Sequence, residues 1–176
     1  MANCTSYTLS GLNAGCKDSV GGVAKIWLAD QSEVSWTVND GIAKPSQGSV
    51  EQAFKVYNLR RGAASMTSTL TVNDNAGSYF TTEIAMNFLK METAKRIEVM
   101  AMLMGQSTGI VKDNNGKYWA IGVEHALEGS AGTGETGTAA SDANQYTVTI
   151  SVDESELPYE ITDATTIAAL EAITVA

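Results

Sequence analysis

The sequence predicts a mainly β fold: an antiparallel β-sandwich or barrel with one flanking α-helix at about residues 91–104. Apolar residues alternate with Ser and Thr in several short segments, which is the period of half-buried strands. Turn residues separate these segments, including an Asn-Gly pair that is typical of a tight hairpin. Only residues 91–104 change to a helical period. This order favours a sandwich or barrel in which the helix covers one opening.

The chain is long enough for one domain. It has 176 residues, of which 44% are hydrophobic, so it can bury a core of its own, whereas two domains would be cramped. We expect an N-terminal arm at 1–21, a single β-sandwich domain at 22–160 and a C-terminal arm at 161–176. The first residues lack the basic and apolar regions of a secretory signal. No run of 18 apolar residues occurs, so we expect no membrane span and assembly in a cytoplasm.

The first half of the domain is expected to consist of strands and turns. Residues 23–29 are apolar on both faces, as in a strand that is covered on both sides. Residues 34–38 alternate and predict a half-buried strand, whereas 41–49, with Pro45 and Gly48, predict a loop. Alternation then predicts three more strands, at 50–59, 66–72 and 79–89. Turn residues at 73–77 predict a hairpin turn between the second and third of these strands.

Residues 91–104 are predicted to form a helix. Ala, Met, Glu, Lys and Arg dominate the segment, and all of them favour helix. Gly105 is a natural C-terminal stop. An apolar stripe follows the helical spacing, with Lys95 and Arg96 on the wetter side, so we expect the stripe to face the core. The stripe consists of Ala94, Ile97, Ala101 and Met104, widened by Val99, Met100 and Leu103.

The second half of the domain alternates between apolar segments and polar turns. Residues 109–112 and 117–121 flank Asp113-Asn114-Asn115-Gly116, a strong hairpin signal. Residues 129–144 are rich in Gly, Ser and Thr and predict a flexible, low-complexity loop. Alternation at 146–152 predicts a further strand, and we expect Pro158 to end order of that kind, with no strand after it. The Ala- and Thr-rich segment 161–176 fits a short helix or a docking arm, and the sequence leaves the two open.

Charge is distributed unevenly along the chain. All eleven Lys and Arg lie at or before Lys117, together with ten acids, so residues 1–117 have a net charge of 11 − 10 = +1. Residues 118–176 have the other ten acids and no Lys or Arg, a net charge of −10. This imbalance argues against direct binding to nucleic acid, which needs cationic groups. It suits a surface that must not adhere to DNA, or alternatively an acidic tail that keeps the protein in solution.

No motif supports catalysis, so we predict no enzyme, no catalytic residue and no cofactor or metal site. His125 is the only histidine, which rules out a His-based zinc site, and no nucleophile motif such as G-x-S-x-G accompanies it. Residues 132–137 match G-x-G-x-x-G, but a polar run and a strand follow, and Glu135 would repel phosphate. Gly116-Lys117 resembles the end of a P-loop, but Tyr118 replaces the Ser or Thr that binds magnesium.

Three other groups of residues have a simpler interpretation than a site. Asp153-Glu154-Ser155-Glu156 could bind calcium weakly, but it lacks the spacing of a dedicated loop and is more typical of a solvated acidic turn. The only cysteines, Cys4 and Cys16, are interpreted as free thiols in preference to a disulfide. The tryptophans fall within strand patterns, which favours core packing over a carbohydrate-binding platform: Trp27, Trp36 and Trp119.

Several predicted strands are apolar on both faces. On an isolated molecule, such strands would leave sheet edges and apolar patches exposed, which natural monomers avoid. We therefore expect copies of the same chain to cover them, so that the working unit is an assembly.

Four strings, and the Gly-rich segment before the last predicted strand, resemble a known family. Together they look like the tail tube proteins of tailed phages, particularly phages of Bacteroidetes hosts, and the resemblance spans most of the chain. The strings are Cys16-Lys17-Asp18-Ser19-Val20-Gly21-Gly22, Lys90-Met91-Glu92-Thr93-Ala94-Lys95-Arg96, Asp113-Asn114-Asn115-Gly116-Lys117-Tyr118-Trp119 and Glu156-Leu157-Pro158-Tyr159.

The resemblance implies a β-sandwich with a flanking helix that assembles into rings, commonly of six, which stack into a tube. Strands of each subunit would line the lumen, and 129–144, the N-terminal arm and 161–176 are candidates for contacts with the next ring. Six copies would have 6 × −9 = −54 formal charges, so genome DNA would pass without specific binding. Expected partners are further copies and other tail proteins (tape measure, tail terminator, baseplate or sheath) in the virion tail. The family implies no catalytic residue.

Two alternatives to a tail tube subunit stay open at this point. The chain could be another phage structural protein, such as a capsid decoration or head-tail joining protein. It could also be a carbohydrate-binding β-sandwich module, given its three tryptophans and six tyrosines.

Overall fold

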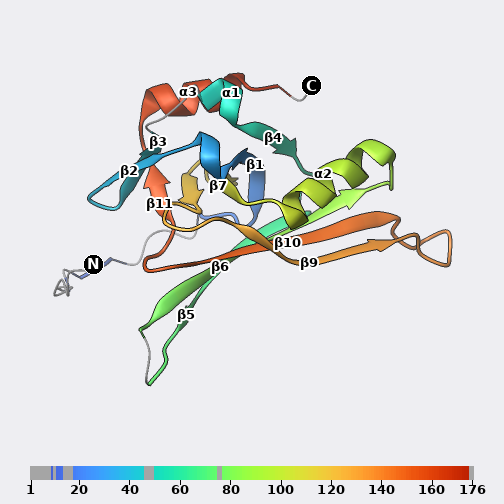
Figure 1. Ribbon diagram of the computed structural model, residues 1–176, viewed down its shortest axis with the longest axis horizontal. Coiled ribbons are helices and arrows are strands. Elements are labelled where there is room, and N and C mark those ends of the chain that lie inside the picture. The colour runs from blue at the N-terminus through green and yellow to red at the C-terminus, as the bar shows by residue number, and fades with distance from the viewer. Residues whose placement is uncertain (1–8, 10, 14–17, 46–49, 75–76, 175–176) are drawn as a thin grey trace.

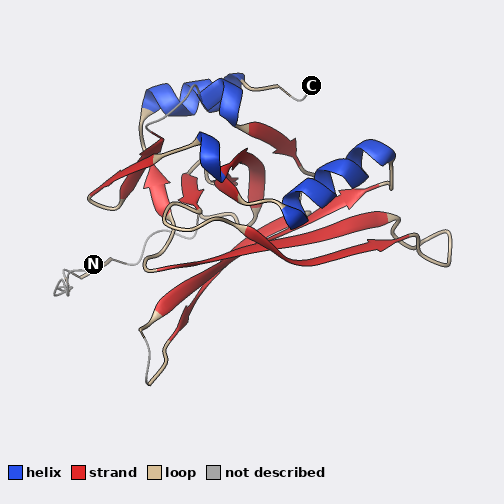
Figure 2. Ribbon diagram, viewed as in Figure 1, coloured by secondary structure: helices blue, strands red, loops and turns tan. Residues whose placement is uncertain are grey.

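The computed structural model describes residues 9, 11–13, 18–45, 50–74 and 77–174. These residues form two β-sheets packed face to face, with helices on the far side of the larger sheet (Figure 1). Figure 2 shows strands in both layers, with helices above the larger sheet and at one end of the sandwich. The predicted mainly β sandwich with a flanking helix is confirmed, and two further short helices join it.

The larger sheet has seven strands, and its central strands are covered on both faces. All its neighbouring strands are antiparallel except β11 and β3, which are parallel. Ile26 and Leu28 of β1 point into the sandwich, whereas Trp27 and Ala29 point to the helices. This explains why residues 23–29 are apolar on both faces. The strand order is β2 (Trp36–Asn39), β3 (Ile42–Pro45), β11 (Tyr159–Ile161), β8 (Tyr118–Ile121), β7 (Ser107–Asp113), β1 (Val23–Asp30) and β4 (Lys55–Asn58).

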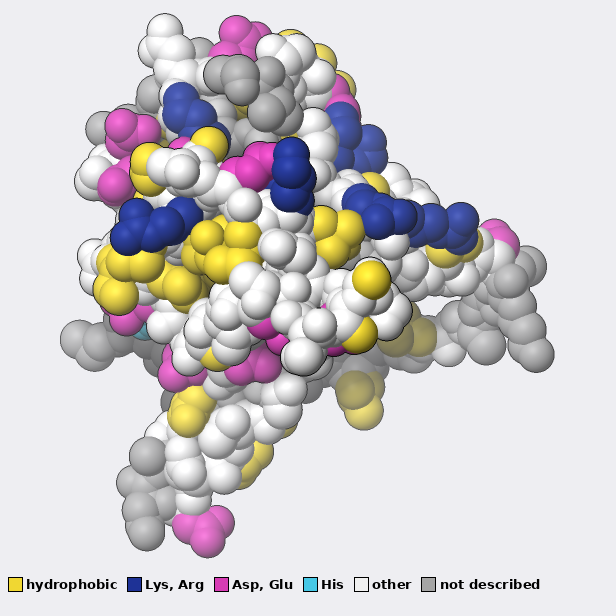
Figure 3. Space-filling model, turned by 90° about the vertical axis from the view of Figure 1, so that its right-hand side faces the viewer, with side chains coloured by type: hydrophobic (Ala, Val, Ile, Leu, Met, Phe, Trp, Pro, Cys, Tyr) yellow, Lys and Arg dark blue, Asp and Glu magenta, His cyan; other side chains and the backbone are white. Residues whose placement is uncertain are grey.

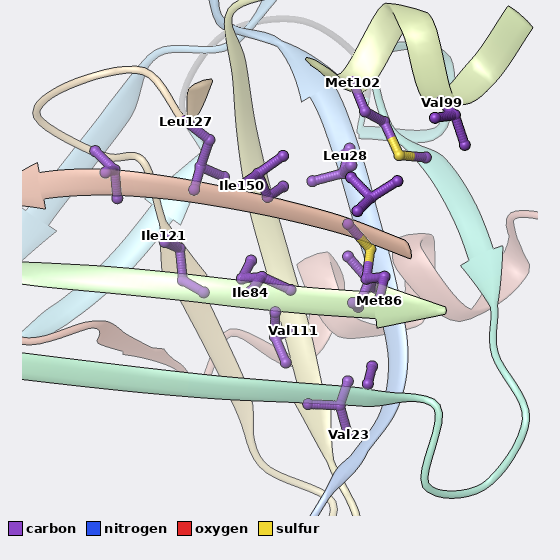
Figure 4. Close-up of a cluster of buried hydrophobic side chains, with 14 residues drawn as sticks. Val23, Leu28, Ile84, Met86, Val99, Met102, Val111, Ile121, Leu127 and Ile150 are labelled. Atoms are coloured by element: carbon purple, nitrogen blue, oxygen red, sulfur yellow. The ribbon is translucent and has the colours of Figure 1, made fainter. Parts of the chain in front are cut away.

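The smaller sheet has four strands, and every pair of neighbours is antiparallel. Its inner face supplies fully buried side chains to the core between the sheets, including Ile84, Met86, Val148 and Ile150. Figure 4 shows Ile84, Met86 and Ile150 meeting Leu28 and Val111 of the larger sheet. The strand order is β5 (Ala64–Thr71), β6 (Tyr79–Leu89), β10 (Gln145–Glu154) and β9 (Glu128–Glu135).

A second core lies on the other face of the larger sheet. Here α1 (Val50–Ala53) and α3 (Ala164–Ala172) cover β1, β7 and β8. Trp27 is fully buried in this core, and its indole Nε1–H donates to the Leu170 carbonyl at 3.0 Å. Of the two alternatives left open for residues 161–176, a helix is present, and it packs on the domain through the fully buried Leu170.

Four local expectations are wrong. Residues 50–59 do not form one strand, because 50–53 make a helical turn before β4. The loop expected at 41–49 contains β3, and its remainder, 46–49, lies outside the described residues. The loop expected at 129–144 begins with strand β9. Another strand, β11, follows Pro158 directly, because Tyr159 and Ile161 are buried against β8.

The helix is present as predicted, but its inward face is only partly the predicted one: Val99 and Leu103, at the margin of the expected stripe, pack on the core. In α2 (Thr93–Met104), Val99 and Met102 are buried in the core between the sheets. Ile97 and Met104 of the expected core stripe are exposed, by 59% and 79%. The helix is apolar on more than one side, so its spacing alone could not determine which side faces inward.

The N-terminal segment is attached to the domain by the hairpin between β7 and β8. The Val20 N–H donates to Asn115 Oδ1 at 2.7 Å, and Asn114 Nδ2 donates to the Gly21 carbonyl at 2.7 Å. The described residues of the expected N-terminal arm contain no helix or strand. Cys4 and Cys16 lie outside the described residues. Among the described residues, no helix has the length and apolar character needed to cross a membrane.

Glu171 holds α3 on the larger sheet. Its carboxylate accepts hydrogen bonds from Lys25 at 2.5 Å, Lys112 at 2.6 Å and the Tyr118 hydroxyl at 2.7 Å. Burial alone would raise the pKa of Glu171, but the hydrogen bonds from Lys112, Lys25 and Tyr118 outweigh it and lower the pKa to about 2.

Replacing Glu171 with Gln is expected to destabilise the fold at neutral pH and to flatten its response to acid. A hydrogen bond to a charged group contributes about 1.5–3 kcal/mol, and the two lysines lose their counter-charge. Because the folded pKa lies below the ordinary value of 4.5, the contribution is complete above that value and is lost as the pH falls towards 2. Urea unfolding between pH 7 and 2 tests this, with Glu51→Gln, an exposed carboxylate on α1, as the control. Equal losses of unfolding free energy in the two variants would contradict the stabilising role of Glu171.

Candidate assembly surface

The outer face of the smaller sheet is hydroxyl-rich and points away from both cores. In Figure 1 this sheet forms the lower layer of the molecule, and its inner face meets the larger sheet. The register places alternate residues of its four strands together on the opposite, outer face. Nine of them are Ser or Thr: Ser65, Thr67, Thr69, Thr71, Thr81, Thr133, Thr147, Thr149 and Ser151.

The charges on this face are all negative. Its acids are Glu83, Glu128, Glu135 and Asp153, and none of the four strands contains Lys or Arg. Thr81 donates to Asp153 at 2.6 Å and Gln145 donates to Glu135 at 2.8 Å, so two of the carboxylates are held in place. Figure 3 shows Lys and Arg side chains on the upper part of one side of the molecule, and none on the sheet that projects below. We call this surface the acidic face.

Both edges of the smaller sheet are open and unprotected. Within the part of the chain that the structure describes, β5 and β9 pair on one side only. Each is eight residues long and contains no Lys, Arg or Pro, and the charges of β9 are confined to its end residues, Glu128 and Glu135. The edge strands of the larger sheet, β2 and β4, have four residues each. Monomeric proteins protect long edges with lysine, proline or shortening, so these two edges are suited to pairing with another chain.

The two open edges run in opposite directions. Because each neighbour in the order β5, β6, β10, β9 is antiparallel, β5 and β9 are antiparallel to each other. A copy related by rotation about an axis parallel to the strands keeps its strand directions, so its β5 would pair with this β9 in antiparallel fashion. The pairing is therefore heterologous: it uses two different surfaces, and it repeats around a ring until the ring closes.

Glycines in β9 allow α2 to lie directly on this edge strand. A Cβ at Gly129 would lie 2.7 Å from Leu103 Cα, and a Cβ at Gly132 would meet the Leu103 side chain. A Cβ at Gly134 would lie 3.1 Å from the Tyr146 ring. Within β9, the Gly-rich composition that predicts a flexible loop therefore reflects close packing around the strand. Gly137, the last glycine of the G-x-G-x-x-G match, lies beyond β9 and has a positive φ of 70°.

Gly129→Ala is expected to destabilise the protein by about 1–3 kcal/mol, because the added methyl group collides with backbone that cannot move without shifting α2. Thermal or urea unfolding measures the loss. Gly77→Ala is the matched control, since a Cβ there meets no atom within 4 Å. Equal stability of the two variants would show that α2 does not lie on β9 as closely as described.

A buried carboxylate fixes the loop that leads into β9. Glu154 is only 2% exposed, and it accepts the N–H groups of Val123 at 2.6 Å and Glu124 at 3.0 Å. Burial raises the pKa of Glu154, although the N–H groups of Glu124 and Val123 oppose the shift. Glu124 in turn accepts from the Ser155 backbone at 3.0 Å. The acidic run 153–156 therefore anchors this loop through Glu154 and Ser155. The interpretation of a solvated turn is wrong for Glu154, whereas Asp153 and Glu156 are exposed.

The tryptophans are tied to the fold by their indole N–H groups, and Trp36 and Trp119 are half-buried. Trp36 Nε1 donates to Thr108 Oγ1 at 2.9 Å, and Trp119 Nε1 lies 3.4 Å from Asp113 Oδ2. Trp27 is fully buried. Their indole N–H groups therefore serve core and turn contacts.

The residues that partly matched catalytic, metal-binding or nucleotide-binding motifs are dispersed over the fold. His125 is exposed in the loop between β8 and β9, and Gly116-Lys117 lies in the turn between β7 and β8. Among the described residues, no group of three His, Cys, Asp or Glu is arranged to hold a metal ion.

Searches against models of known protein families, curated proteins and solved structures found no match to this chain.

Proposed function

We propose that this chain is a structural subunit of a phage tail tube, in which neighbouring copies pair β9 with β5 to close a ring. The observation that supports this most strongly is the pair of long, unprotected, oppositely directed edges on a single sheet. Ring closure removes both edges at once, because a barrel has none. The acidic face then lines a continuous bore.

The size of such a ring fits a DNA conduit. Six copies of a four-stranded sheet give a barrel of 24 strands. At about 4.8 Å between strands, its circumference is about 115 Å and its diameter about 37 Å, before strand tilt widens it further. This leaves room for a DNA double helix inside the side chains.

The charge of the acidic face fits passage of DNA without adhesion. Six copies bring 6 × 4 = 24 carboxylates to the bore. Retention of DNA needs Lys or Arg that displace condensed counterions, and the four strands have neither. The proposal includes a location in the virion tail after assembly in the host cytoplasm, with other tail proteins (tape measure, tail terminator, baseplate or sheath) at the tube ends or around it.

Negative-stain electron microscopy of the concentrated protein tests the proposal. We expect rings with an open centre and stacks of rings that form tubes. Rings that never stack would favour the alternative of a head-tail joining protein, which shares the open edges but not the tube. A protein that stays monomeric at high concentration and at every salt concentration would refute the ring.

A further inference from the structure

The outer side of α2 is apolar and uncovered in the described part of the chain. Ile97, Met100 and Met104 are 59%, 44% and 79% exposed, and Ala94 and Ala101 beside them are exposed as well. The opposite side of the helix packs into the core through Val99 and Met102. A helix that is apolar on opposite sides is typical of one packed between two layers, and one layer is already in place. Figure 3, which views the end of the sandwich where α2 lies, shows hydrophobic side chains gathered in a band across it.

The C-terminal end of α2 and a residue just before its start both lie on the open edge strand β9. Leu103, near the end of α2, packs on Gly129 and Gly132. Met91, just before its start, lies against Gly134, with its Cε 3.3 Å from where a Cβ would be. A strand that joined β9 at this edge would therefore lie alongside α2, and alternate side chains of that strand would point to the same side of the sheet as the helix.

In the proposed ring, the strand that joins β9 is β5 of a neighbouring copy. This strand has apolar side chains on the inner face of the sheet, the side on which α2 lies. The register of β5 with β6 places Met66, Ser68 and Leu70 opposite Ile84, Thr82 and Phe80, on the inner face of the sheet. Leu70 is 50% exposed there, even though it lies on the inner face. On the inner face of β5, Met66 already packs against the core of its own subunit, and Leu70 is the apolar side chain left exposed. A single strand pairing would thus bring Leu70 and the uncovered apolar side of α2 together.

We propose that the outer side of α2 packs against the inner face of β5 of a neighbouring copy, so that each ring contact combines strand pairing with a hydrophobic helix contact. The inference rests on the proposed tube function, which provides the pairing of β9 with β5. A second copy is the partner, because α2 lies through Leu103 on β9, the edge strand that the ring uses.

Met100→Glu tests the energetic part of the proposal. Glutamate favours helix as well as methionine does, so the fold is retained, while a charge enters the contact. We expect the protein concentration needed for assembly, measured by sedimentation, to rise at least tenfold. Leu157→Glu is the matched control, because Leu157 is an exposed apolar residue (54%) in the turn after β10, and it should assemble like the unmodified protein. Equal behaviour of the two variants would overturn the inference.

Cross-linking between molecules tests the geometric part. In a background with Cys4→Ser and Cys16→Ser, molecules with Met100→Cys are mixed with molecules that have one cysteine on β5, and the assembled fraction is treated with a short bis-maleimide. We expect cross-links to at least one of Met66→Cys, Ser68→Cys and Leu70→Cys on the inner face. We expect none to Thr67→Cys, the matched position on the outer face.

The outcomes separate this inference from the tube proposal. Rings that form with no inner-face cross-link, or with equal cross-linking to Thr67→Cys, overturn the helix contact and leave the tube intact. A protein that never assembles overturns both.

Discussion

A proline at one of two neighbouring positions in β5 is expected to abolish assembly while leaving the fold intact. Successive N–H groups of a strand point to opposite edges, so one of Thr67 and Ser68 directs its N–H towards β6 and the other towards the open edge. Proline is tolerated on an edge strand where the missing N–H faced solvent. The outward-facing substitution therefore keeps the bonds to β6 and removes a donor that the neighbouring β9 would use.

We expect a large loss of assembly, because the missing backbone hydrogen bond recurs at every contact between subunits of the ring. A backbone group left without its hydrogen-bond partner costs about 1–3 kcal/mol, and a closed ring contains one such defect per subunit. Sedimentation velocity should therefore show monomers at concentrations where the unmodified protein forms rings, with the melting temperature little changed.

Thr67→Pro and Ser68→Pro are controls for each other. The variant with the inward-facing proline should lose stability, because it breaks the pairing of β5 with β6. If both variants assemble, β5 is not the ring edge. If both unfold, the same test is repeated on Ala131 and Gly132 of β9, where N–H groups also alternate between β10 and the open edge.

Much of the fold could be predicted from the sequence, because apolar and polar residues alternate along most of its strands. Residues 23–29, 66–72, 79–89 and 146–152 are strands as predicted, since alternation reports which side of a strand is covered. The hairpin at 113–116 is also confirmed, because its Asn-Gly turn is a local signal.

The strand β9 could not be predicted, because its sequence lacks the usual signals. All eight of its residues are exposed, so no apolar alternation marks it. Glycines are typical of loops, but the reason for Gly129 and Gly132 lies 26 and 29 residues away, in Leu103 of α2. The reason for Gly134 lies in the side chains of Tyr146 and Met91. A glycine that serves close packing looks the same in a sequence as one that serves flexibility.

The inward face of α2 was mispredicted for a related reason. The spacing of Ala94, Ile97, Ala101 and Met104 predicts the centre of the stripe, but the side that faces the core is centred on Val99 and Met102, of which only Val99 belonged to the predicted stripe, at its margin. Only the position of the helix on β9 and β10 determines which stripe faces the core. The stripe that remains outside is the one to which we assign a contact with another copy, so the prediction identified an apolar surface but placed it on the wrong side.

Introducing lysines on the acidic face is expected to convert it from a surface that repels DNA into one that retains it. Glu83 and Asp153 lie on the central strands β6 and β10, away from both ring edges, so Glu83→Lys with Asp153→Lys should leave assembly unchanged. The substitutions take the charge of the face from −4 to 0 per subunit and place 12 lysines in a ring of six. Assembled variant should co-sediment with duplex DNA, with a dissociation constant on the order of micromolar near physiological salt and a steep fall in affinity as salt increases.

The control separates the bore from the rest of the surface. Glu33→Lys with Glu51→Lys makes the same change in net charge at exposed residues outside the smaller sheet. A bore lined by the acidic face concentrates its new lysines around one channel, where several can contact the same duplex, whereas lysines on the exterior are spread over separate subunits. DNA binding should therefore be strong and salt-sensitive in the first variant and weak in the second. If both variants bind DNA equally, the acidic face does not line the bore, and its lack of Lys and Arg has another cause.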